Sequence, residues 1–106
     1  MKRGDLVIVA TSGDGGKPFP AMVVQAEPFD LHPTVIILPL TLDLHDAPLF
    51  RVTVHAGGRT GLLRDSQIMV DKATTVPRAR IGTRVGKVDP PTLQAVDQAL
   101  RGFLGL

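Results

Sequence analysis

The feature that most limits the fold is the shortness of the apolar runs, because glycine and proline interrupt the chain every few residues. Such short runs, bounded by turn-forming residues, are typical of β-strands rather than of helices. Strands are predicted at residues 5–10, 21–24, 34–41, 50–55, 67–70 and 74–76. Several short strands followed by one helix indicate a mainly β protein, a small half-open β-barrel with a C-terminal helix.

A proline-stiffened loop precedes the second predicted strand. Pro18 and Pro20 restrict their own φ angles and favour extended backbone at Lys17 and Phe19. A rigid loop that leads into a buried strand is a suitable place for a binding or reacting group. The alternative is that Phe19 is a core aromatic residue that closes one end of the barrel.

A further proline and a change of period complete the secondary-structure prediction. Pro39 is expected to end the strand 34–41 or to place a bulge in it. Near the C-terminus the period changes to that of a helix, with Asp89 as N-cap and an Asp97–Arg101 pair on its surface. The apolar face of this helix is formed by Leu93, Val96, Leu100 and Phe103.

Length and charge set the next limits. A chain of 106 residues predicts one domain, residues 1–106, with a net charge of only +2. No acidic residue lies between Asp71 and Asp89, whereas five basic residues do. Such a cluster attracts phosphates or an acidic peptide, unless it is simply a solvated face. Its members are Lys72, Arg78, Arg80, Arg84 and Lys87.

Several classes of protein are disfavoured by what the chain lacks. It has no cysteine, and its three histidines fit no zinc-binding spacing, so neither a metal nor a cofactor is expected. The motifs GxxxxGK[ST], GxGxxG and GxSxG are absent. The N-terminus lacks the apolar core of a signal peptide, and the run 35–40 is too short to cross a bilayer. A soluble, cytoplasmic protein is therefore expected.

Five segments in order resemble the MazF/PemK family of toxins from type II toxin–antitoxin systems. They are RGDL at 3–6, GKPFPAMVV at 16–24, VIILPLT at 35–41, GLLRDSQIMVDK at 61–72 and VPRARIG at 76–82. Together with the closing helix, the resemblance covers nearly the whole chain. It implies a homodimeric, SH3-like barrel of the CcdB/MazF type.

The resemblance also implies an activity. Toxins of this family cut single-stranded RNA at short sequences without a metal, and leave a 2′,3′-cyclic phosphate and a 5′-hydroxyl. An arginine before the second strand and a threonine at the end of the third carry the reaction. The threonine corresponds to Thr41, whereas the position of the arginine is occupied by Phe19. Because phenylalanine cannot hold a phosphate, cleavage is expected to be weakened or altered.

Three explanations of the missing arginine remain open. Lys17 could reach the same phosphate, or Arg78 or Arg80 could supply the cation in place of the arginine. Otherwise the chain is a weakened toxin that still binds RNA and antitoxin. The family's antitoxins wrap an acidic, disordered segment around the toxin, and RNA and antitoxin are expected to share a surface. Its predicted residues are Asp14, Asp71, Lys72, Arg78, Arg80 and Arg84.

Two other functions remain possible at this point. CcdB-type toxins share the fold but poison DNA gyrase through their extreme C-terminus, and the residues 102–106 faintly resemble such a tail. A homologue without catalytic activity, which only binds RNA or sequesters antitoxin, is the other alternative.

Overall fold

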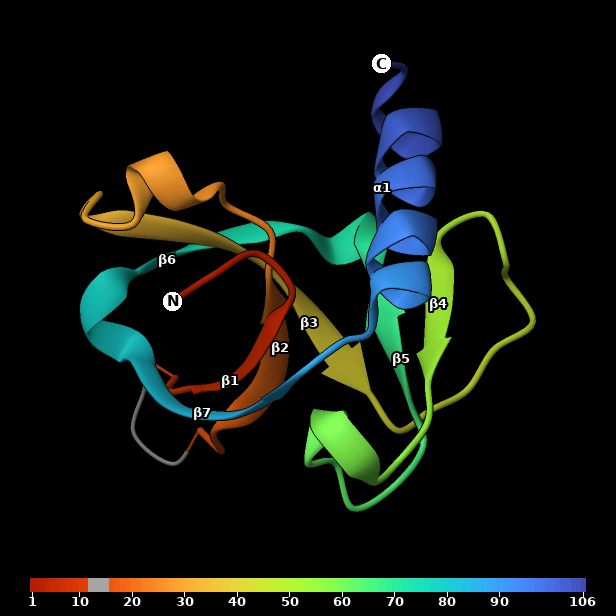
Figure 1. Cartoon of the computed structure of the whole chain (residues 1–106), viewed down its shortest axis with the longest axis horizontal. Helices are drawn as coiled ribbons and strands as arrows, with labels where there is room; N and C mark the ends of the chain where they lie inside the picture. Colours follow the sequence, from red (N-terminus) through yellow and green to blue (C-terminus); the bar gives the residue numbers. More distant parts are fainter. Residues whose placement is uncertain (12–15) are drawn as a thin grey trace.

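The computed structural model of the chain describes residues 1–11 and 16–106, and in them seven antiparallel strands and one α-helix (Figure 1). Asp14 lies outside the described residues. The elements are β1 (Asp5–Val9), β2 (Phe19–Val23), β3 (Thr34–Thr41), β4 (Arg51–Val54), β5 (Ser66–Met69), β6 (Thr74–Pro77), β7 (Ile81–Lys87) and α1 (Pro90–Leu104). Short 3₁₀ turns are formed by Glu27–Phe29, Gly58–Thr60, Val70–Lys72 and Arg78–Arg80.

The strands form one curved sheet in the order β4-β5-β3-β2-β1-β7, and β6 also pairs with β3. Within the described residues β4 and β7 are the two ends of this order, so the sheet is not closed into a full barrel. Figure 1 shows the strands curling around a common centre, with α1 beside β4 and β5. The prediction of a mainly β, half-open barrel with a C-terminal helix is confirmed.

The prediction for Pro39 is wrong, because β3 continues through it to Thr41 without a bulge. Pro39 pairs with Ala21 of β2 on one side. On its other side β3 pairs with β6 only up to Ile37 and with β5 only from Leu40 onward. The missing N–H of Pro39 therefore falls where β3 passes from one partner strand to the other.

The sheet separates two apolar clusters, because side chains alternate between its faces. One cluster lies between the sheet and α1 and includes Leu6, Met22, Leu38, Ile68 and Val96, all fully buried. The other lies inside the curl of the sheet and contains Val7, Val9, Ala21, Val23, Val35, Ile37 and Val76. The strands at the centre of the sheet are therefore buried on both faces, as the apolar run in β2 predicts.

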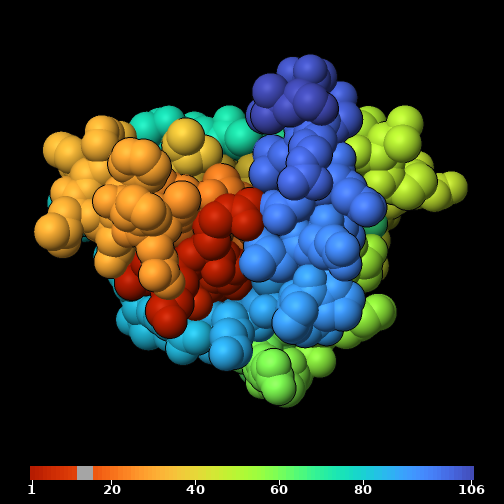
Figure 2. Space-filling model, turned by 45° about the horizontal axis from the view of Figure 1, so that its top comes forward, coloured from red at the N-terminus to blue at the C-terminus, as the bar shows by residue number. Residues whose placement is uncertain are grey.

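Helix α1 begins as predicted, since the Asp89 side chain accepts a hydrogen bond from the Thr92 N–H at 2.8 Å. Asp97 does not pair with Arg101, however. It binds the Arg3 guanidinium, whose Nε also donates to the Val24 carbonyl at 2.9 Å. Figure 2 shows α1 on the surface beside the N-terminal residues that this contact joins to it. Among the described residues, no helix is long and apolar enough to cross a membrane.

Candidate active site

The two positions that the family resemblance singles out belong to neighbouring paired strands, β2 and β3. Ala21 is opposite Pro39 in this antiparallel ladder. The ladder between the two strands ends at this pair. Phe19 is the first residue of β2 and Thr41 is the last residue of β3, so both follow the paired residues at the same end of the ladder.

Phe19 itself is a packing residue. It is half-buried and lies against the apolar cluster inside the curl of the sheet, which includes Val7 and Val9. This agrees with the second interpretation made from the sequence, that the ring closes one end of the barrel. The aromatic ring leaves this position without a cation for a phosphate.

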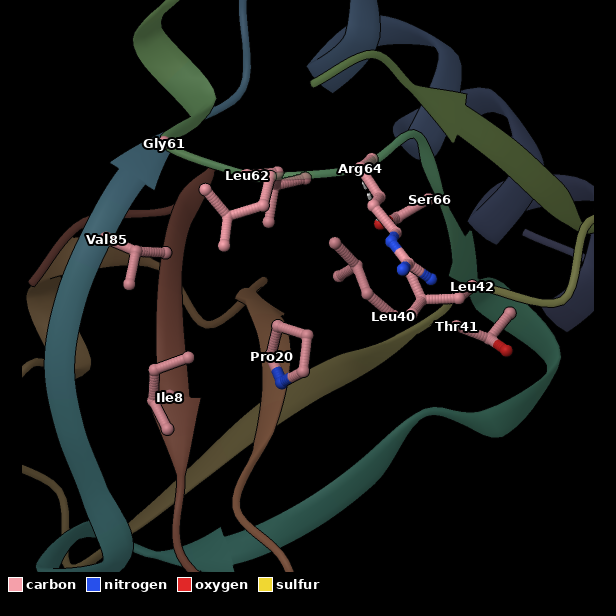
Figure 3. A pocket seen from close by; sticks show the side chains of 11 residues that line it. Ile8, Pro20, Leu40, Thr41, Leu42, Gly61, Leu62, Arg64, Ser66 and Val85 are labelled. Atoms are coloured by element: carbon pink, nitrogen blue, oxygen red, sulfur yellow. Dashed lines mark hydrogen bonds between the residues drawn. The ribbon is translucent and has the colours of Figure 1, made fainter. Parts of the chain in front are cut away.

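A pocket of about 440 Å³ adjoins Thr41. Its floor is apolar, and the segment between Gly61 and Ser66 crosses over it (Figure 3). Arg64 is exposed and belongs to this segment, and Figure 3 shows its guanidinium directed toward the end of β3. The lining residues are Ile8, Pro20, Leu40, Thr41, Leu42, Gly61, Leu62, Leu63, Arg64, Ser66 and Val85.

The loop after β3 is held against β5 by one buried side chain. Gln67, which is opposite Thr41 in the β3–β5 ladder, accepts a hydrogen bond from the His45 N–H at 2.9 Å and donates one to the His45 carbonyl at 2.8 Å. Within the loop, the Asp43 N–H donates to Thr41 Oγ1 at 3.1 Å, and Asp43 Oδ2 lies 3.0 Å from His45 Nε2. Thr41, Asp43 and His45 thus form a connected polar cluster at the end of β3.

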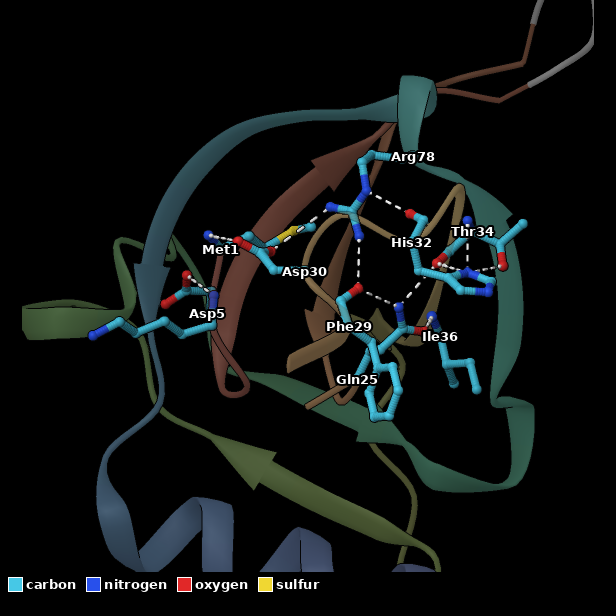
Figure 4. Close-up of polar contacts among 10 residues, drawn as sticks. Met1, Asp5, Gln25, Phe29, Asp30, His32, Thr34, Ile36 and Arg78 are labelled. Carbon is cyan, nitrogen blue, oxygen red and sulfur yellow. Dashed lines mark hydrogen bonds and ion pairs between the residues drawn. The ribbon is translucent and has the colours of Figure 1, made fainter. Parts of the chain in front are cut away.

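The fold divides the basic stretch that the sequence shows. Arg78 donates from Nε to the His32 carbonyl at 2.7 Å and lies 3.8 Å from Asp30, so it holds the loop before β3 (Figure 4). Arg84 pairs with the buried carboxylate of Asp5 at 3.1 Å. Both guanidinium groups are occupied by partners within the chain.

The other predicted cations have different surroundings. Arg80 has no side-chain partner among the described residues, and its carbonyl accepts from the Ala10 N–H. It belongs to the turn that follows β6, and Pro77 at the end of β6 lies opposite Thr34, the first residue of β3. Arg80 therefore follows a strand end that pairs with the start of β3, whereas Thr41 is at the other end of β3.

Three predicted site residues remain. Lys17 is exposed in the segment before β2, and Lys72 is exposed at the end of the 3₁₀ turn that precedes β6, whereas Arg78 follows β6. The Asp71 carboxylate is bound by Arg51 at 2.9 and 3.3 Å. This hydrogen bonding lowers the pKa of Asp71 below that of an ordinary carboxyl. A role for these residues in binding RNA or antitoxin stays a prediction.

Sequence reasoning missed Arg64 and His45. Arg64 lies more than twenty positions from Thr41, and only the return of the chain through β5 brings it to the pocket. His45 was considered only as a zinc ligand, although its spacing from Thr41 and Asp43 was a usable signal. In the described ranges 1–11 and 16–106, no group of three or more His, Asp or Glu side chains is arranged to hold a metal ion.

The half-open antiparallel barrel with a C-terminal helix is the fold of solved MazF structures. The solved structure of the Mycobacterium tuberculosis toxin MazF-mt6 matches 96% of this chain and 97% of its own, with a TM-score of 0.83 at 21% identity. A MazE–MazF structure from Deinococcus radiodurans matches 100% and 97%, with a TM-score of 0.82 at 22% identity.

The sequence comparison identifies the family. The family model described as "PemK-like, MazF-like toxin of type II toxin-antitoxin system" matches residues 2–104, and the chain belongs to this family. It is also 39% identical, over 100% of its own length and 98% of the relative's, to a protein named "Probable endoribonuclease MazF" from Mycolicibacterium smegmatis. These matches favour the endoribonuclease prediction over the gyrase alternative.

Proposed function

We propose that this chain is the toxin of a type II toxin–antitoxin system and cleaves single-stranded RNA at short sequences without a metal. The cleavage leaves a 2′,3′-cyclic phosphate and a 5′-hydroxyl. The observation that carries the proposal is the full-length match to the MazF-like family, including the relative named as an endoribonuclease. The pocket beside Thr41 supports it, because it offers an apolar floor next to groups that bind phosphate.

The reaction needs charge stabilisation at the phosphate. As the 2′-oxygen attacks phosphorus, negative charge grows on the non-bridging oxygens. The Thr41 hydroxyl accepts from the Asp43 N–H, which leaves its own hydrogen free to donate to such an oxygen. In place of the missing arginine at position 19, the guanidinium of Arg64 supplies the cation, since its planar fork can bind two phosphate oxygens.

The partners follow from the same family membership. The toxin acts as a homodimer in the cytoplasm and is neutralised by an antitoxin with an acidic segment. A solved relative is a complex of the MazE and MazF proteins, in agreement with a partner of this kind. The positive net charge of the chain favours the encounter with either an acidic peptide or RNA.

The test is the cleavage of a long mixed-sequence RNA in EDTA, with the new termini mapped for cyclic phosphate. The native chain is expected to cut, and Thr41→Ala and Arg64→Gln are each expected to lose about 100-fold or more in rate. Arg101→Gln removes an exposed arginine of α1 and is the matched control, with a change of less than about twofold. Phe19→Arg is expected to raise the rate.

The other outcomes separate the alternatives. Loss of activity in Lys17→Gln but not in Arg64→Gln would assign the cation to Lys17. Cleavage only by Phe19→Arg would mean that the native chain is a disabled toxin that binds RNA and antitoxin. If neither the native chain nor Phe19→Arg cuts RNA, the endoribonuclease proposal fails.

A further inference from the structure

We infer that His45 is the proton acceptor for the 2′-hydroxyl in this cleavage, and that Asp43 and Gln67 are its positioning residues. The inference rests on the proposed function and concerns the same site. Its observations are two contacts of Asp43, whose backbone N–H donates to Thr41 Oγ1 and whose carboxylate lies at hydrogen-bond distance from the His45 imidazole.

The position of His45 is imposed by β5. Gln67 is only 6% exposed, and its side-chain amide forms hydrogen bonds with both the N–H and the carbonyl of His45. It therefore replaces the backbone of a neighbouring strand as the partner of His45. Because Gln67 lies opposite Thr41 in the β3–β5 register, the same strand position sets the locations of the hydroxyl and the histidine. Without this clamp, residues 42–45 would be an exposed loop with no fixed distance to Thr41.

The contact with Asp43 determines which ring nitrogen can act as a base. A carboxylate only accepts hydrogen bonds, so the neutral His45 ring carries its hydrogen on Nε2, which faces Asp43 Oδ2 at 3.0 Å. Nδ1 is then the unprotonated nitrogen and is available to a substrate. The Asp43 and His45 side chains are 80% and 55% exposed, so an RNA strand can reach them.

The surroundings contain no cation in contact with the ring among the described residues. Asp43 and the neighbouring Asp46 are the charged groups of the loop. The elements packed beside it contribute neutral groups, Gln67 of β5 and Thr53 of β4, which lie 3.4 Å apart. Arg64 is the cation that lines the neighbouring pocket, to which Leu42 of the same loop also contributes.

The proposed step balances without another catalyst. The proton of the 2′-hydroxyl passes to His45 Nδ1 as the 2′-oxygen forms its bond to phosphorus. The bond from phosphorus to the 5′-oxygen breaks, this oxygen takes a proton from water, and the hydroxide that remains takes the proton from His45, which restores the neutral imidazole. Thr41 holds the phosphate, and Asp43 contacts both Thr41 and the His45 imidazole. Phe19, the first residue of β2, offers neither a base nor a cation at the position where the family has its arginine.

The chain contains its own control. His55 and Asp65 form a second exposed pair, with His55 Nδ1 at 3.3 Å from Asp65 Oδ2, at the far end of β4. Hydrogen bonds from the Ala56 N–H and from His55 lower the pKa of Asp65. This pair has the same chemistry as His45 and Asp43 but no contact with Thr41 or with the pocket.

The experiment measures single-turnover cleavage between pH 5 and 9 for the native chain, His45→Gln, His55→Gln and Asp43→Asn. The native rate is expected to rise with pH through the range in which histidines titrate. His45→Gln should lose this rise and about 100-fold or more in rate at pH 8, because a general base contributes at least that factor. His55→Gln should match the native chain. Asp43→Asn should be slower but keep the rise, since the imidazole remains.

A binding measurement separates the base from a structural role. The affinity of His45→Gln for a 2′-O-methyl RNA, which cannot be cleaved, should stay within about twofold of the native value. Native rate and pH dependence in His45→Gln, beside an inactive Thr41→Ala, would overturn the inference and leave the proposed function standing. A loss of RNA affinity that accounts for the slower rate would also overturn it. Absence of cleavage by the native chain and by Phe19→Arg would remove the proposed function, and the role of His45 with it.

Discussion

At the scale of single residues, the pair of Arg51 and Asp71 makes stability depend on pH. Arg51 donates two hydrogen bonds to the Asp71 carboxylate, and the side chains are only 12% and 21% exposed. The pair lowers the pKa of Asp71 in the folded chain. Because the unfolded chain has the higher pKa, this stabilisation is complete above about pH 5 and is lost as the pH falls through the folded pKa.

Asp71→Asn is therefore expected to lower the free energy of unfolding by about 2 kcal/mol at pH 7, and by much less at pH 3. Urea unfolding at the two pH values measures the difference. Asp46→Asn is the control, because Asp46 is exposed and has no ion pair among the described residues, and its effect should stay below about 0.5 kcal/mol. An equal loss at both pH values in Asp71→Asn would show that the pair does not titrate in this range.

At the scale of elements, Arg3 ties the start of the chain to α1. The sequence pattern predicts a pair between Asp97 and Arg101, but the structure places Asp97 against Arg3, which also binds the end of β2. Double-mutant cycles with Gln and Asn distinguish the two pairs. A coupling free energy of about 1 kcal/mol is expected between Arg3 and Asp97, and less than about 0.3 kcal/mol between Asp97 and Arg101. Both coupling free energies are measured by urea unfolding at low salt. A larger coupling between Asp97 and Arg101 than between Arg3 and Asp97 would contradict the contact in the structure.

The elements that could be predicted from the sequence are those whose local pattern agrees with their final surroundings. Strand β3 was predicted with its observed bounds because it is apolar throughout, and α1 because its cap and its apolar period agree. Strand β7 was missed: its glycines and charges show no regular alternation, and its pairing with β1 contains register shifts. At the site, the position of Thr41 was predictable, whereas the approach of Arg64 and the clamp on His45 depend on β5, a strand distant in sequence.

At the scale of the whole molecule, the fold decides which cations remain available to RNA. In the sequence the stretch from Lys72 to Lys87 is one basic cluster. In the structure Arg78 and Arg84 are bound to groups of the chain itself, whereas Arg64 lines the pocket beside Thr41. Local charge density along the sequence is therefore a poor guide to the RNA surface, because pairing of β7 with β1 and of β3 with β6 separates its members.

This division predicts how RNA binding responds to salt. Each lost contact between a cation and a phosphate reduces the slope of log K against log salt concentration by about 0.7 for a single strand. Arg64→Gln is expected to reduce the slope by this amount, measured with a 2′-O-methyl RNA. Arg78→Gln should leave the slope unchanged and instead lower the midpoint of urea unfolding, since it removes the hydrogen bond to the His32 carbonyl. A reduced slope in Arg78→Gln, with Arg64→Gln unchanged, would place the RNA over the loop before β3 and away from the Thr41 pocket.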